Sequence, residues 1–152
     1  QIGNWRMDAR FNRDDLIERI SRISKRKNHI HLYNKDVNSF IQNYLPRYQQ
    51  NAFVYFDPPY RPLTETSNFT AYTENLFDDE KQIELANFVE RISNKGAMVV
   101  VSNSDPKNTN KEDEFFDKIY AIHKIKRVEA TRMINCNSDA RGRIKELLIS
   151  NF

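Results

Sequence analysis

The segment of this sequence best suited to chemistry is Asp57-Pro58-Pro59-Tyr60. Its two prolines fix two φ angles and remove two amide donors, so the segment is stiff and presents carbonyl groups. Asp57 adds a carboxylate that only accepts hydrogen bonds when it is ionised, and Tyr60 adds an aromatic face. Together these groups suit a flat ring that carries an amino group, as a nucleobase does. A rigid turn with a capping Asp57 and a core Tyr60 is the alternative interpretation.

Two apolar runs position this cluster and a second polar one. Residues 52–56 are nearly all apolar, which is typical of a strand that is covered on both faces, and the run ends at Asp57. Residues 97–101 predict another such strand, and Ser102-Asn103-Ser104 follows it. Ligands of α/β sheets bind outside the carboxyl ends of the strands, so both clusters lie where a binding site is expected.

The rest of the chain predicts the other elements of an α/β fold. Apolar residues at helical spacing predict helices over residues 13–27, 37–44, 79–94 and 111–119, with Asn12 and Asp78 as N-caps. Further strands are predicted over residues 29–33, 120–128 and 147–149. The buried face of the third helix is expected to contain Ile83, Leu85, Ala86, Phe88, Val89 and Ile92. This order predicts a mostly parallel sheet with a C-terminal antiparallel strand pair.

Composition limits the function classes that this chain can serve. A length of 152 residues suits one domain or a large piece of one, and a net charge of +3 permits a nucleic-acid partner without requiring it. The single cysteine, Cys136, excludes an internal disulfide framework and fits a reducing, cytoplasmic setting. No apolar run approaches the roughly 18 residues of a membrane span, so no membrane partner is expected. The three histidines lack metal-ligand spacing, so no metal site is expected either.

The apolar run and its polar end, residues 53–60, resemble the catalytic half of the Dam-type (D12 class) DNA adenine-N6 methyltransferases. Residues 68–72, Phe77, residues 99–104 and the tail 141–152 are similar to the same family, and the resemblance runs from about Asn12 to the C-terminus. It implies a Rossmann-like, S-adenosylmethionine-dependent methyltransferase fold. It also implies a site-specific enzyme that transfers a methyl group to an adenine flipped out of double-stranded DNA.

The resemblance assigns the catalytic role to Asp57, Pro58, Pro59 and Tyr60. Asp57 and the Pro58 carbonyl would accept hydrogen bonds from the adenine amino group, and Tyr60 would stack on the flipped ring. The free amine is a poor nucleophile because its lone pair is delocalised into the ring, and two acceptors would draw the nitrogen towards a tetrahedral form.

Other residues are assigned to the cofactor and to the DNA in the same way. Asp36, Val37 and Asp57 would bind S-adenosylmethionine, although an N-cap role for Asp36 is an equal alternative. Phe69 and Tyr72 would close over the target base, where the alternative is a small hydrophobic cluster. A further pair, Arg132 and Arg141, would contact DNA phosphates, where the alternative is a solvated surface.

The chain departs from the family in lacking its N-terminal Phe-x-Gly-x-Gly cofactor loop, since its three glycines are isolated. We therefore expect residues 1–10 to be the end of a target-recognition region and residues 11–152 to be the C-terminal part of the catalytic domain. Such a fragment is expected to be inactive alone and to need the missing N-terminal part as a partner. A cognate restriction endonuclease is a further candidate partner.

The sequence leaves two other functions open. Related motifs serve other planar amines, so an RNA or other planar-amine methyltransferase is one alternative. A non-catalytic DNA-binding remnant is the other, and the absent glycine-rich loop favours it for the isolated chain.

Overall fold

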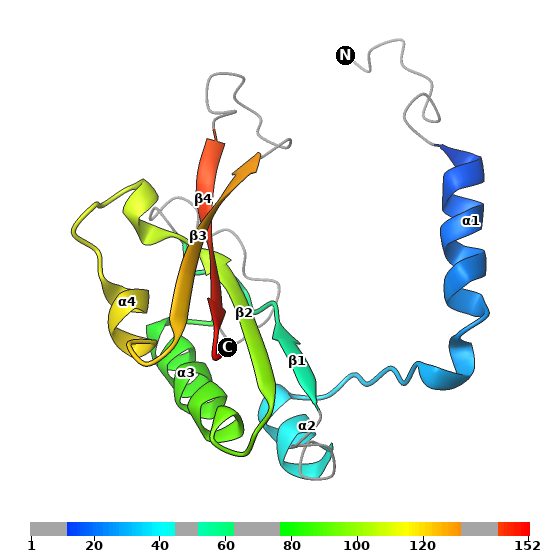
Figure 1. The fold of residues 1–152 in the computed structure, drawn as a ribbon, viewed down its shortest axis with the longest axis horizontal. Helices are drawn as coiled ribbons and strands as arrows, with labels where there is room; N and C mark the ends of the chain where they lie inside the picture. Colours follow the sequence, from blue (N-terminus) through cyan, green and yellow to red (C-terminus); the bar gives the residue numbers. More distant parts are fainter. Residues whose placement is uncertain (1–11, 45–51, 63–76, 132–142) are drawn as a thin grey trace. The chain divides into compact units, whose positions relative to one another are not determined.

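The computed structural model describes residues 12–44, 52–62, 77–131 and 143–152, and it divides into two compact units, residues 1–41 and 42–152. Each unit is described by itself. In the first unit, α1 (Arg13–Ser24) and η1 (Lys27–His29) precede α2 (Val37–Tyr44), whose last turn enters the second unit. The second unit contains β1 (Phe53–Phe56), α3 (Asp79–Ser93), β2 (Met98–Ser104), η5 (Pro106–Asn108), α4 (Phe115–Ile119), β3 (Lys124–Thr131) and β4 (Arg143–Ser150) (Figure 1).

The four strands of the second unit form one mixed sheet in the order β1-β2-β4-β3. The pair β1 and β2 is parallel, whereas β4 is antiparallel to both β2 and β3. Three strands therefore run in one direction and β4 runs against them. The expected C-terminal antiparallel pair is confirmed, but only one of the three strand pairings is parallel. The insertion of β4 between β2 and β3 was not expected from the strand order.

The last strand, β4, lies at the centre of this sheet. Leu147 and Ile149 are almost fully buried, and Ile149 pairs with the equally buried Val101 of β2. The Asn151 side chain extends the pairing: its Nδ2 donates to the Ala97 carbonyl and its Oδ1 accepts from the Val99 amide, each at 2.8 Å. The Asn151 side chain thus takes the place of a further strand residue, and it satisfies the backbone hydrogen-bonding groups of Ala97 and Val99.

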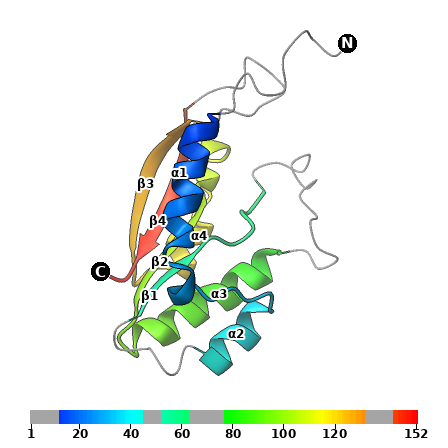
Figure 2. The ribbon, with the colours of Figure 1, turned by 90° about the vertical axis from the view of Figure 1, so that its right-hand side faces the viewer.

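Helix α3 covers one face of the sheet, and α4 lies on the same side (Figure 2). Asp78 is the N-cap of α3, as predicted, and the Asp78 side chain accepts a hydrogen bond from the Lys81 amide. Five of the six expected core residues are buried, but Ile83 is 41% exposed. Gln82 is fully buried in place of Ile83, so the buried stripe of α3 includes an amide side chain that the apolar pattern did not predict.

On the other face of β1, the described residues of this unit leave two aromatic side chains largely exposed. Phe53 is 61% exposed and Tyr55 is 54% exposed, whereas the alternate residues Val54 and Phe56 are half-buried. Phe56 contacts Phe88 of α3 edge to face, with ring centroids 6.0 Å apart. Within the described residues of this unit, helices pack on one side of the sheet, so the expected cover on both faces of β1 is not found in this part of the chain.

The strand expected over residues 29–33 is absent from the described part of the chain. Lys27–His29 form η1 instead, and residues 30–36 have no regular structure. Leu32 is 91% exposed. Alternation of apolar and polar residues can stabilise a strand only where a neighbouring strand supplies hydrogen bonds, and the described residues of this unit include none.

The remaining elements differ from expectation mainly at their ends. α1 and α2 form where predicted, with Asn12 as the N-cap of α1. The predicted helix 111–119 is limited to α4, and η5 precedes it. The predicted strands 97–101, 120–128 and 147–149 become β2, β3 and β4, which end later than expected. No helix in the described ranges combines the length and the hydropathy of a membrane span.

The end of α3 provides a direct test of this fold. Gly96 follows the helix with a φ of 94°, a conformation that is unfavourable for residues with a Cβ. Gly96→Ala should therefore lower the free energy of unfolding by about 1 kcal/mol, measured by urea denaturation. Asn94→Ala is the matched control, because Asn94 has an ordinary φ of −64°. Equal effects of the two substitutions would contradict the assigned backbone geometry.

Candidate active site

The two polar clusters meet at the carboxyl ends of β1 and β2. Phe56 pairs with Val101 in the parallel register, so Asp57 and Ser102 are the next residues along the two strands. The Ser102 hydroxyl donates a hydrogen bond to Asp57 Oδ1 at 2.9 Å and lies 3.4 Å from the Phe56 carbonyl oxygen. Ser102 is buried and Asp57 is exposed. The buried hydroxyl therefore orients a carboxylate that solvent can reach.

One carboxylate oxygen of Asp57 is bound by Ser102, and the other has no partner among the described residues. Within the described part of the chain, Oδ2 accepts no hydrogen bond, whereas Oδ1 accepts from Ser102. The side chain caps no helix, so the alternative interpretation of Asp57 as a turn cap has no support in this geometry. A carboxylate that is fixed through one oxygen can accept a hydrogen bond from a ligand through the other.

Tyr60 lies half-buried beside the same groups. Burial raises the pKa of the Tyr60 hydroxyl, and a hydrogen bond with Ser102 acts in the opposite direction. The negative charges of Glu146 and Asp57 raise the pKa further. The phenol is therefore neutral at physiological pH, and its partly exposed ring can serve as an uncharged aromatic surface.

The backbone between Pro59 and Arg61 is bound by side chains from α3 and β2. Gln82 Nε2 donates to the Pro59 carbonyl oxygen at 3.1 Å, and the Arg61 amide donates to Asn103 Oδ1 at 3.0 Å. The Ser104 hydroxyl donates to the Arg61 carbonyl oxygen at 2.7 Å. These three side chains, Gln82, Asn103 and Ser104, are all at least 99% buried. The polar residues at the end of β2 thus support the segment as well as its carboxylate.

Arg61 ties the segment to two further parts of the second unit. Its Nε and Nη2 donate to the two carboxylate oxygens of Asp79 at 2.7 and 2.9 Å, and its Nη1 donates to Asp113 Oδ2 at 2.8 Å. The guanidinium also lies 4.4 Å above the ring centroid of Phe115. The hydrogen bond with Asp79 is the largest cause of a raised pKa at Arg61. Arg61 therefore remains charged, and its ion pairs fix the position of the backbone directly after Tyr60.

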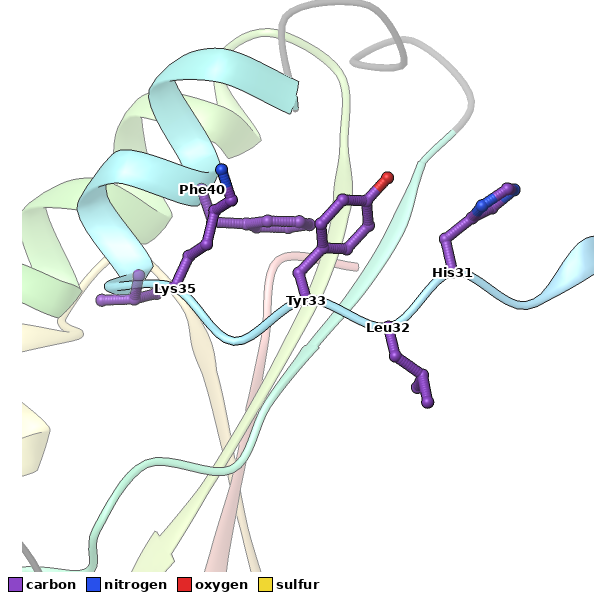
Figure 3. Close-up of a pocket in the computed structure, with 6 residues that line it drawn as sticks. His31, Leu32, Tyr33, Lys35 and Phe40 are labelled. Carbon is purple, nitrogen blue, oxygen red and sulfur yellow. The ribbon is translucent and has the colours of Figure 1, made fainter.

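Asp36 and Val37 belong to the other unit, where Val37 borders a hollow of about 360 Å³. The rings of Tyr33 and Phe40 lie side by side in this hollow, with centroids 5.2 Å apart (Figure 3). Asp36 Oδ1 accepts a hydrogen bond from the Ser39 amide at 3.2 Å, so the predicted N-cap role of Asp36 is confirmed. The cofactor role of Asp36 stays a prediction.

The other predicted site residues are the aromatic and arginine residues assigned to the DNA. Phe69, Tyr72, Arg132 and Arg141 lie outside the described residues. In the ranges that the structure does describe, no three His, Cys, Asp or Glu side chains gather as metal ligands would.

Comparison with known proteins assigns the chain to a family. Residues 4–134 match the D12 class N6 adenine-specific DNA methyltransferases. This match covers most of the chain. The chain belongs to this family.

Three relatives illustrate the similarity. The type II methyltransferase M.MjaIII of Methanocaldococcus jannaschii is 48% identical over 102 residues, which cover 66% of this chain and 33% of that protein. The type II methyltransferase M1.LlaDCHI of Lactococcus lactis subsp. cremoris is 38% identical, over 68% of this chain and 34% of that protein. The DNA adenine methylase of Escherichia coli (strain K12) is 36% identical, over 68% and 35%. The chain spans about a third of the length of these relatives.

Sequence reasoning about this D12-class chain found its Asp-Pro-Pro-Tyr segment but missed the residues that support it. Gln82 lies on the buried stripe of α3, three residues before Leu85 and seven before Val89. A glutamine at such a position is a signal in itself, because buried polar side chains need hydrogen-bond partners. Arg61 was missed because its partners Asp79 and Asp113 are distant in sequence.

The ion pair between Arg61 and Asp113 predicts a pH-dependent stability. Burial alone would raise the pKa of Asp113, but hydrogen bonds from the Phe115 amide and from Arg61 outweigh it and lower the pKa below its ordinary 3.8. Asp113 therefore stabilises the folded state above pH 3.8, and this contribution is lost as the pH falls through the lowered pKa. Asp113→Asn should cost about 1 kcal/mol at pH 7, and the difference from wild type should shrink at pH 3.

Urea denaturation at the two pH values measures this difference. Glu112→Gln is the matched control, because Glu112 is an exposed neighbour on the same segment. A loss of stability that is the same at pH 7 and pH 3 would show that the charge of Asp113 is not what stabilises the fold.

Proposed function

We propose that this chain is the catalytic region of an S-adenosylmethionine-dependent adenine-N6 DNA methyltransferase with a Rossmann-like fold. The observation that carries the proposal is the exposed Asp57 carboxylate, held through one oxygen by Ser102 at the end of a parallel strand pair. Family membership and a mixed sheet with its last strand reversed support the same conclusion.

The proposed substrate explains why the segment consists of acceptors and an aromatic ring. An adenine amino group has two N–H donors and a lone pair that is delocalised into the ring. Asp57 Oδ2 and the Pro58 carbonyl would accept these two hydrogen bonds, which favours a tetrahedral nitrogen with a localised lone pair. Tyr60 would stack on the base, which leaves the DNA duplex because base-modifying enzymes cannot reach their target atom inside it.

Asp57 would also accept the proton that the reaction releases. Transfer of the methyl group would break its bond to the cofactor's sulfonium sulfur and leave the amino nitrogen with a positive charge and one proton to lose. Asp57 Oδ2, already hydrogen-bonded to that nitrogen, is the acceptor closest to this proton. Ser102 would keep the carboxylate in this orientation throughout, so that positioning supplies much of the rate acceleration.

The residues of the first unit suit the adenine end of S-adenosylmethionine. The Tyr33 and Phe40 rings and Val37 provide apolar contact for a flat ring, and the neighbouring Asp36 carboxylate is an acceptor for its amino group. When bound, this cofactor supplies an electrophilic methyl group. We assign its binding to Asp36 and Val37, with Asp57 as a further contact.

The whole protein's partners follow from the same proposal. The chain corresponds to about a third of its relatives, so we propose that it acts with an N-terminal part that completes the cofactor site. Residues 1–10 would end the target-recognition region and residues 11–152 would form the C-terminal part of the catalytic domain. Phe69, Tyr72, Arg132 and Arg141 would bind double-stranded DNA in the cytoplasm, and a cognate restriction endonuclease would be the partner in a restriction–modification system.

The role of Asp57 can be tested by substitution in the full-length protein that contains this chain. Asp57→Ala should reduce tritiated-methyl transfer to duplex DNA by at least about 10²-fold, because it removes the acceptor that stabilises the reacting amine. The melting temperature should change little, since Asp57 is exposed. Glu84→Gln, on the exposed side of α3, is the control and should retain activity. Near-normal transfer by Asp57→Ala would remove Asp57 from catalysis.

The nucleic-acid substrate needs a separate experiment. Methyl transfer to duplex DNA should exceed transfer to RNA of the same sequence, and nuclease digestion of the product should yield N6-methyladenine. Preferential methylation of RNA would favour the alternative substrate class. An absence of transfer to either would favour a non-catalytic role.

A further inference from the structure

Gln82 and Asn103 form a buried amide pair that none of the proposed chemical steps uses. Both side chains are fully buried, and Asn103 Nδ2 donates to Gln82 Oε1 at 3.2 Å. Each amide has a second contact: Gln82 Nε2 donates to the Pro59 carbonyl oxygen, and Asn103 Oδ1 accepts from the Arg61 amide. The pair therefore closes a ring of hydrogen bonds around Tyr60, between the residue before it and the residue after it.

This ring compensates for a weakness of the segment itself. Pro58 and Pro59 have no N–H groups, and within the described residues no backbone hydrogen bond closes the segment through the Tyr60 amide. Side chains bind a carbonyl oxygen of the segment and the amide that follows Tyr60 instead. The structure binds the Pro59 carbonyl through Gln82 and the Arg61 amide through Asn103.

Fixing the Pro59 carbonyl also restrains the carbonyl of Pro58. Each peptide group is planar, and the two planes meet at the Cα of Pro59. The proline ring fixes φ at this residue, which leaves ψ as the one soft rotation between the two carbonyl groups. The hydrogen bond from Gln82 restrains that rotation. Gln82 can therefore set the direction of the Pro58 carbonyl without contacting it.

We infer that Gln82 is a positioning residue that, together with Asn103, aims the Pro58 carbonyl at the amino group of the target adenine. This inference rests on the proposed function, in which that carbonyl and Asp57 Oδ2 are the two acceptors. The hydrogen bonds of the Gln82 side chain go to the Pro59 carbonyl and to Asn103, not to either of the two acceptor atoms. Its loss should therefore reduce the rate of the chemical step and leave substrate affinity nearly unchanged.

The test compares two variants of Gln82 in the full-length protein. Gln82→Met keeps the approximate volume but removes both hydrogen bonds, and kcat for methyl transfer to duplex DNA should fall by about 10²-fold, with KM for DNA changed by less than about threefold. Gln82→Glu can restore the donor to Pro59 only while its carboxyl group is protonated. Its activity should therefore be recovered at low pH and fall as the pH rises, in contrast to wild type.

A control separates positioning from stability. Val89 is a buried residue of the same α3 face, two turns further along. Val89→Ala should lower the melting temperature but retain kcat per folded molecule. If Gln82→Met behaves like Val89→Ala, or if the pH profile of Gln82→Glu matches wild type, the inference is wrong. A wild-type protein that does not methylate adenine would instead refute the proposed function, so the two failures are distinguishable.

Discussion

The absence of backbone donors at Pro58 and Pro59 is the constraint on which the described site depends. Within the described residues no backbone hydrogen bond closes this segment, and side chains at the end of β2 and on the buried face of α3 hold it instead. The parallel pairing of β1 with β2 brings Ser102 beside Asp57, and the next two residues of β2 contact Arg61. The register of one strand pair thus determines the geometry of the whole segment.

This arrangement separates the groups that meet a ligand from the groups that orient them. Asp57 is exposed, whereas Ser102, Asn103 and Gln82 are buried. Buried hydrogen bonds are more rigid and electrostatically stronger than those in water. The exposed carboxylate can therefore be held in one orientation, which an acceptor for a reacting amine requires.

Local patterns predicted the parts of the fold that depend on neighbouring residues in sequence. The helices α1, α2 and α3 and the polar ends of β1 and β2 were found because apolar spacing and caps are local signals. The insertion of β4 depends on pairing with β2, which the chain order does not encode. Residues 29–33 alternate like a strand but have no partner strand in the described part of their unit. Gln82 was overlooked because its partners, Pro59 and Asn103, are more than twenty residues away.

A crystal structure of the full-length protein with duplex DNA and a cofactor analogue tests the central claim most directly. We predict that the target adenine lies outside the duplex with its amino nitrogen about 2.6–3.2 Å from Asp57 Oδ2, while Ser102 still contacts Oδ1. An adenine bound elsewhere, or a carboxylate that remains bonded only to protein groups, would contradict the account.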